Sequence, residues 1–158
     1  MMKIHVKQTI VINRPTEDVF AYISNLENLL DWSSFIISLR TILPGVVGVG
    51  ATTKNTIRFL GKRSEMTLEV VEWEPSHSLT IKSTSGVTPC LFYYQFEQLE
   101  NGGTSIAQDA VISFIEGFRD LTEQVVLNAI HRDLEHGLLT LKDMLETSTS
   151  TYCSAVRV

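Results

Sequence analysis

The longest periodic pattern in the chain lies between about Gly117 and Glu146, where apolar residues recur at the spacing of an α-helix. At roughly 100° per residue, one arc of this helix collects most of its apolar side chains. They are Val126, Ile130, Leu134, Leu138, Leu141, Met144 and Leu145. A stripe of this length needs an equally long apolar surface to lie on. Only the strand-like segments that precede the helix can supply that surface.

Most of the chain before this helix alternates between apolar and polar residues, which is the pattern of strands with one buried face. The first such segment covers residues 3–13. Five more strands, separated by turns rich in Gly, Pro and Asn, are predicted at residues 52–60, 63–73, 78–83, 90–99 and 104–114. Residues 33–43 are apolar without a clear period and predict an irregular strand or coil.

Two short helices are predicted after the first strand. Thr16 is expected to cap the first, whose opening turn carries acidic residues, and the second covers about Glu27 to Asp31. The order predicts an α+β domain in which a curved antiparallel sheet of about six to seven strands wraps around one long C-terminal helix. This single ligand-binding domain is expected to span residues 1–146. The Ser- and Thr-rich residues 147–158 are expected to form a flexible tail.

Composition and charge narrow the class of protein. The formal net charge of −5 argues against a broad surface for nucleic acid or anionic membrane. No apolar run approaches the roughly 20 residues that span a bilayer, so no stable membrane insertion is expected, and the N-terminus lacks a signal peptide, so the expected location is cytoplasmic. Cys90 and Cys153 are expected to be free thiols. No residue spacing resembles a metal site, and neither a metal nor a cofactor is expected.

Strand alternation indicates which side chains face the helix, although a one-residue bulge would invert this phase locally. The candidate pocket residues on the strands are Asn55, Ile57, Phe59, Met66, Leu68, Phe92, Tyr94, Phe96, Gln108 and Ile112. Ile130 and Leu134 face them from the helix. Because the set is apolar and aromatic, it predicts the wall of a pocket for a small hydrophobic molecule. The same residues would also form an ordinary filled core.

Three polar members of this set, Asn55, Tyr94 and Gln108, lie among apolar neighbours. An unpaired polar group costs roughly 1–3 kcal/mol in such surroundings. Each therefore needs a partner in the protein, in water or in a ligand. Together they predict a hydrated end of the cavity.

Two residues of the long helix interrupt its apolar arc. Glu123 lies at the centre of the arc, where it either pairs with Arg119 one turn earlier or faces the cavity mouth and orients a ligand or acts as an acid or base. Gly137 lies on the same arc, although a glycine inside a helix costs about 1 kcal/mol relative to alanine. It would allow a close approach to the sheet or a slight bend, either of which would widen a cavity.

Six short segments carry a family resemblance through their order and spacing. They are Val11 to Phe20, Asn25 to Trp32, Gly48 to Ala51, Val70 to Pro75, Gly102 to Thr104 and Leu141 to Glu146. Together they resemble the helix-grip (START/SRPBCC-like) superfamily, and look closest to the bacterial polyketide cyclase/dehydrase-like proteins. The resemblance implies an apolar cavity between sheet and long helix, with Trp32 near its entrance. It also implies a monomer or a homodimer.

Three functions remain open at this point. The main prediction is that the protein binds or carries a lipid, a sterol or a polyketide-like molecule in its cavity. The alternative is an enzyme of the polyketide cyclase/dehydrase type, for which Tyr94, Gln108 and Glu123 are the only candidate acid or base groups. The third is a protein-interaction module on the same fold, which would need an exposed apolar patch and a filled core.

Overall fold

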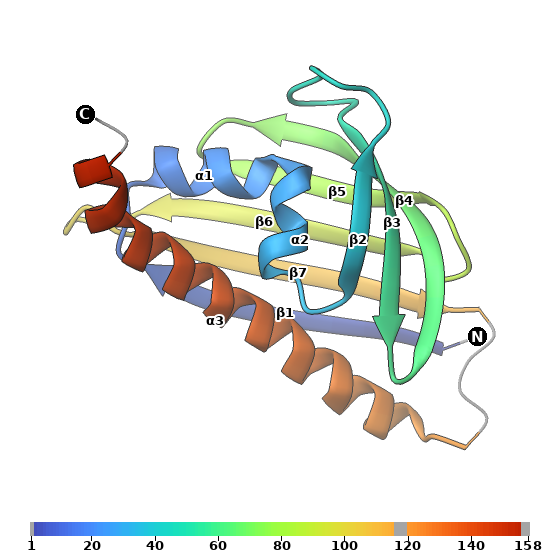
Figure 1. The fold of residues 1–158 in the computed structure, drawn as a ribbon. Coiled ribbons are helices and arrows are strands. Elements are labelled where there is room, and N and C mark those ends of the chain that lie inside the picture. The colour runs from blue at the N-terminus through green and yellow to red at the C-terminus, as the bar shows by residue number, and fades with distance from the viewer. Residues whose placement is uncertain (1, 116–119, 156–158) are drawn as a thin grey trace.

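The computed structural model describes residues 2–115 and 120–155, with side chains described as far as Thr147 (Figure 1). In chain order the elements are β1 (Met2–Ile12), α1 (Thr16–Ser24), the 3-10 helix η1 (Leu26–Asn28), α2 (Leu29–Trp32), β2 (Ile36–Thr41), β3 (Thr52–Phe59), β4 (Lys62–Glu74), β5 (Ser78–Ser85), β6 (Cys90–Gln98), β7 (Thr104–Phe114) and α3 (Glu123–Ala155).

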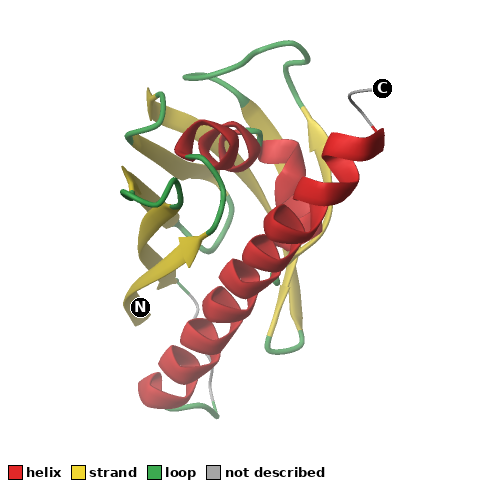
Figure 2. Ribbon diagram, turned by 90° about the vertical axis from the view of Figure 1, so that its left-hand side faces the viewer, coloured by secondary structure: helices red, strands yellow, loops and turns green. Residues whose placement is uncertain are grey.

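The strands form one antiparallel sheet in the order β1-β7-β6-β5-β4-β3-β2. Consecutive strands pair from β2 to β7, while β1 pairs with β7 and not with β2. Because β1 and β2 lie at opposite edges, the chain between them has to cross one face of the sheet. Figures 1 and 2 show the short helices crossing that face, with α3 beside them. The predicted two-layer arrangement of a curved sheet around a long helix is confirmed.

The apolar stripe of α3 is buried as its periodicity predicts, from Val126 to Leu145. Hydrogen bonds attach the second half of the helix to the end of β1. Lys142 Nζ donates to the Val11 carbonyl at 2.6 Å, and Arg14 Nη1 donates to the Leu145 carbonyl at 2.7 Å. These bonds hold the stripe toward the sheet. No helix in the described part of the chain has both the length and the apolarity to cross a membrane.

Both ends of α3 differ from the prediction. The helix begins at Glu123, where the Thr122 hydroxyl accepts a hydrogen bond from the Val125 N–H at 3.2 Å and so caps it, whereas Gly117 lies outside the described residues. At the other end the helix continues to Ala155, through the segment whose composition predicts a flexible tail. No Gly or Pro interrupts residues 147–155, so nothing in that segment stops the helix.

The cap predicted at the first short helix is wrong. Thr16 is the first residue inside α1, and its hydroxyl instead lies 3.0 Å from that of Thr104 on β7. Both threonines are buried, so each hydroxyl needs a partner inside the protein. The pair fixes the start of α1 against the start of β7.

A bulge in β4 changes which side chains face inward. The sequence pattern allowed for such a local change of phase. The register of β4 against β5 shifts between Val70 and Glu72, so the inward side chains are Met66, Leu68 and Val70 before the shift and Trp73 after it. The Trp73 ring lies 6.0 Å from that of Phe20 on α1. The irregular segment at 33–43 contains a true strand, β2, which also carries a register shift.

The stripe of α3 gives a direct stability test. Leu141 is 0% exposed and Leu139, two residues earlier on the same helix, is 51% exposed. We expect Leu141→Ala to lower the free energy of unfolding by about 2–5 kcal/mol, because it leaves a cavity in the core. Leu139→Ala should change it by less than about 0.5 kcal/mol. Urea denaturation of both variants measures the difference, and equal effects would contradict the placement of the helix.

Candidate ligand cavity

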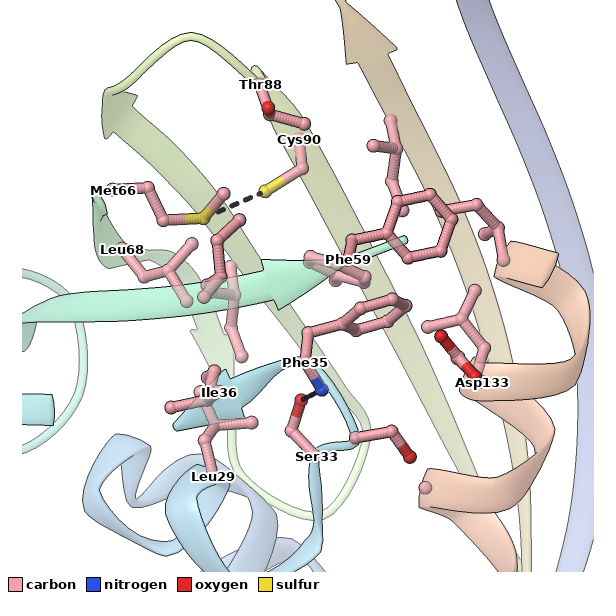
Figure 3. Close-up of a pocket in the computed structure, with 18 of the residues that line it drawn as sticks. Leu29, Ser33, Phe35, Ile36, Phe59, Met66, Leu68, Thr88, Cys90 and Asp133 are labelled. Carbon is pink, nitrogen blue, oxygen red and sulfur yellow. Dashed lines mark hydrogen bonds between the residues drawn. The ribbon is translucent and has the colours of Figure 1, made fainter. Parts of the chain in front are cut away.

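A cavity of about 80 Å³ lies between the concave face of the sheet, α3 and the segment from α2 to β2 (Figure 3). Its lining residues from the strands are Ile57, Phe59, Met66, Leu68, Ile81, Cys90, Phe92, Tyr94, Gln108, Ile112 and Phe114. The lining residues from the helices and loops are Leu29, Trp32, Ser33, Ser34, Phe35, Ile36, Thr88, Ile130, Asp133, Leu134 and Gly137. Most of these side chains are apolar, so the cavity favours an apolar occupant.

Aromatic rings contact one another along one wall of the cavity. The Phe59 ring stacks on Phe114 and meets Phe35 edge-on, with both pairs of ring centroids 5.6 Å apart. Phe35 belongs to the segment that crosses the sheet, so this contact ties that segment to β3. Across the cavity, Trp32 meets Tyr94 edge-on at 6.5 Å. Bulky rings held in such contacts cannot collapse into the space between them as flexible side chains would.

The enclosed end of the cavity is polar. Gln108 is 2% exposed, and its Nε2 donates to the Tyr94 hydroxyl oxygen at 3.0 Å. Its Oε1 is buried and has no hydrogen-bond partner among the described residues, and the same holds for Trp32 Nε1. Burial raises the pKa of Tyr94 far above its ordinary value, so the phenol stays protonated. The Tyr94 oxygen already accepts from Gln108, so the hydrogen of its O–H remains available to donate to another group.

The other polar lining residues mark the mouth, because they are all at least partly exposed. They are Ser33, Ser34, Thr88 and Asp133. Gly137 lies one turn after Asp133 on α3, and a Cβ at Gly137 would lie 3.2 Å from the Trp32 carbonyl oxygen. The glycine thus allows the close approach that the sequence predicts, but to the segment after α2 and not to the sheet. This contact places the mouth segment against α3.

Cys90 is the thiol of the cavity wall. Its Sγ donates to Met66 Sδ at 3.8 Å, and burial raises the pKa of the thiol to about 11. The thiol is therefore protonated at neutral pH and unreactive as a nucleophile. Within the described residues, no three His, Cys, Asp or Glu side chains are grouped so that they could hold a metal ion.

The structure places most of the predicted pocket residues around one cavity. They are Trp32, Ile57, Phe59, Met66, Leu68, Phe92, Tyr94, Gln108, Ile112, Ile130 and Leu134. Sequence reasoning missed Phe35 and Asp133. Phe35 lies in the segment without a clear period, and no pattern singles it out. Asp133 could have been found, because it lies three residues after Ile130 and four before Gly137, on the edge of the apolar arc.

Two of the pocket residues predicted on the strands do not line the cavity. Asn55 is buried, but its amide bonds within the sheet to the Thr53 carbonyl and hydroxyl, at 3.2 and 3.1 Å. Asn55 therefore does not belong to the predicted polar trio, whose other two members, Tyr94 and Gln108, lie together at the polar end. Phe96 packs edge-on against Phe20 at 5.1 Å, because α1 covers that end of β6.

The predicted position of Glu123 at the cavity mouth also differs from the structure. It is exposed and begins α3, away from the cavity, so it does not face the mouth. The helical projection counted the apolar arc from Gly117, but the first residues of a helix that begins at Glu123 do not pack on the sheet. A carboxylate at this position interacts favourably with the helix dipole. Its alternative partner, Arg119, lies outside the described residues.

Solved structures with the same architecture define the class of the fold. A START superfamily protein from Mycobacterium smegmatis is similar over 92% of this chain and 99% of its own, with a TM-score of 0.75 and 14% identity. The protein TTHA0849 from Thermus thermophilus has the same TM-score and coverage at 18% identity. SA2116 from Staphylococcus aureus has a TM-score of 0.66 and 16% identity, over 94% of this chain and 98% of its own. The protein has the helix-grip fold, as the sequence resemblance predicts.

The family follows from the sequence itself. The model of the family described as polyketide cyclase / dehydrase and lipid transport matches residues 3–146, so the chain belongs to this family. No curated protein matches the chain. The family and the fold establish a ligand-binding module in general terms, without naming the ligand.

The raised pKa of Cys90 predicts an unusual pH dependence of thiol modification. In a Cys153→Ser variant, Cys90 is the single cysteine. We expect its alkylation rate by iodoacetamide to rise about tenfold per pH unit from pH 8 to 10, because only the thiolate reacts and the pKa is about 11. The control is an exposed cysteine in an unstructured peptide, which has a pKa of about 8.5, so its rate levels off above roughly pH 9.5. A rate for Cys90 that levels off at the same pH would contradict its burial.

Proposed function

We propose that the protein binds a small, mostly apolar molecule carrying one hydroxyl or carbonyl group, which lies at the Tyr94–Gln108 end of the cavity. The observation that carries this proposal is the buried Oε1 of Gln108, which has no hydrogen-bond partner in the described part of the chain. A buried acceptor without a partner costs about 1–3 kcal/mol. A ligand that donates to it would remove this cost on binding.

The polar end has a defined hydrogen-bonding pattern. Gln108 Oε1 offers an acceptor, and the Tyr94 O–H offers a donor beside it. A ligand hydroxyl can donate to the first and accept from the second, so it satisfies both at once. A carbonyl can accept from Tyr94 alone. A hydroxyl is therefore the better match of the two.

The size of the cavity limits the rest of the ligand. At about 80 Å³ it is smaller than the roughly 300–1,000 Å³ typical of ligand pockets. A single aromatic ring or a slender alkyl chain suits this space. A molecule of sterol size would require the segment from Ser33 to Ile36 to move away from α3.

Binding fits this site better than turnover does. Of the three acid or base candidates from the sequence, Glu123 lies outside the cavity and Gln108 does not ionise. Tyr94 stays protonated because burial raises its pKa, so it could donate a proton but leaves the cavity without a base from this set. A protein-interaction module would need an exposed apolar patch and a filled core, and the described part of the structure has only some exposed apolar residues. Val47 and Val49 are well exposed in the loop after β2, but the core holds a cavity and is not filled.

Removing the Tyr94 hydroxyl tests the proposal. Isothermal titration calorimetry with p-cresol and toluene compares two ligands that differ by one hydroxyl. We expect wild-type protein to bind p-cresol more tightly than toluene. Tyr94→Phe should weaken p-cresol binding by about 0.5–1.5 kcal/mol, roughly 2- to 10-fold, because one hydrogen bond is lost. Toluene binding should not change.

The neighbouring tyrosine provides the matched control. Tyr93 lies on the opposite face of β6, because side chains alternate along a strand. Tyr93→Phe should leave both ligands unaffected. The proposal is wrong if wild-type protein binds neither ligand, or if Tyr94→Phe and Tyr93→Phe have the same effect.

A further inference from the structure

The charged side chain that lines the cavity is negative. Among the described residues that line the cavity, Asp133 is the single side chain that carries a formal charge at neutral pH, and none is a Lys, Arg or His. The cavity therefore offers a carboxylate to one end of a ligand and no cation to balance an acid. Proteins that bind fatty acids or other carboxylates need a cation or a set of donors for the anionic group. The donors here, the Tyr94 O–H and Trp32 Nε1–H, are neutral, so they do not balance an anionic charge.

Asp133 is placed so that a ligand in the cavity would meet it. Figure 3 shows its side chain projecting from α3 toward Phe35. Gly137, one turn later on the same face, approaches Trp32 and Ser34, and Asp133 lines the same cavity as Ser33 and Ser34. The polar groups thus fall at two places: Tyr94 and Gln108 at the enclosed end, and Asp133 at the mouth.

The surroundings of Asp133 leave its charge poorly compensated. No salt bridge or hydrogen bond joins it to any of the described residues. Burial raises the pKa of this carboxyl, while Arg132 and His136, its neighbours on α3, lower it by a smaller amount. Desolvation therefore outweighs the attraction of the nearby basic groups. A ligand cation at the mouth would stabilise the ionised carboxylate, and a ligand anion would be repelled by it.

We propose that the cavity selects amphiphiles by charge, taking neutral and amine-bearing molecules and excluding carboxylic acids, with Asp133 as the residue that sets this preference. This inference rests on the proposed function, because it assumes that an apolar ligand enters the cavity. It separates the ligand from the fatty acids, which are anionic at neutral pH. It points instead to alcohols, phenols and primary amines on a slender apolar frame.

Three ligands with the same chain test the proposal at pH 7. Octanol is neutral, octylamine is cationic and octanoate is anionic, and each is used below the concentration at which it forms micelles. We expect calorimetry to show that wild-type protein binds octanol and octylamine about tenfold or more tightly than octanoate, as expected for one partly desolvated charge. In Asp133→Asn the preference for octylamine over octanoate should disappear, while octanol affinity should stay within about twofold.

A second acidic residue of α3 provides the control. Asp143 is exposed on the same helix and does not line the cavity. Asp143→Asn removes the same charge from the protein, so it should leave the order of the three ligands unchanged. Thermal melting of both variants checks that the fold is retained.

The outcomes separate this inference from the proposed function. Charge selection by Asp133 is wrong if octanol binds but octanoate binds as tightly as octylamine. It is equally wrong if Asp133→Asn and Asp143→Asn change the preference to the same extent. If octanol, octylamine and p-cresol all fail to bind, the proposed function itself is wrong and the inference fails with it.

Discussion

The placement of β1 and β2 at opposite edges of one sheet is the constraint on which the rest of this protein depends. The chain between these strands has to travel the width of the sheet, and it does so on the face that α3 also occupies. Two sets of helices then share one apolar surface. Where they meet, at Gly137 and the segment after α2, their side chains do not fill the space completely. The cavity is thus a consequence of topology before it is a feature of any one residue.

The walls of the cavity combine rigid aromatic rings with a small number of polar groups. The rings of Phe35, Phe59 and Phe114 contact one another in series, so each limits the movement of the next. A wall of this kind keeps an apolar space available without a ligand, because the rings cannot turn into it without losing their mutual contacts. Within that wall, Tyr94 and Gln108 provide the polar pair that can orient a molecule.

Asp133, the residue proposed to set the charge preference, is not placed where it would stabilise the fold. A carboxylate whose pKa is raised by burial is less favourably placed than it would be in water. Such a residue contributes little to folding, so its presence at the mouth is easier to explain by recognition than by stability. The matching feature is that none of the described residues that line the cavity has a cationic side chain.

Periodicity in the sequence determined much of this protein. The stripe from Val126 to Leu145 and the alternation of the strands were sufficient to predict the sheet, the long helix and most of the cavity wall. These predictions succeed because side-chain direction follows directly from position in a helix or strand. The inner face of β7, which carries Gln108 and Ile112, is the clearest case, since no bulge interrupts it.

Only the tertiary structure decided where each inward side chain finds its partner. Asn55, Tyr94 and Gln108 have the same sequence signature. Asn55 is satisfied within its own sheet, while the Gln108 Oε1 has no partner in the part of the chain that the structure describes. Glu123 lies on the predicted apolar arc but begins the helix in solvent, and Asp133 on the edge of that arc reaches the cavity. A helical projection gives the angle of a residue but not what lies opposite it. That depends on segments distant in the sequence, here the crossing chain at Trp32 to Ile36, whose position is set by the order of the strands.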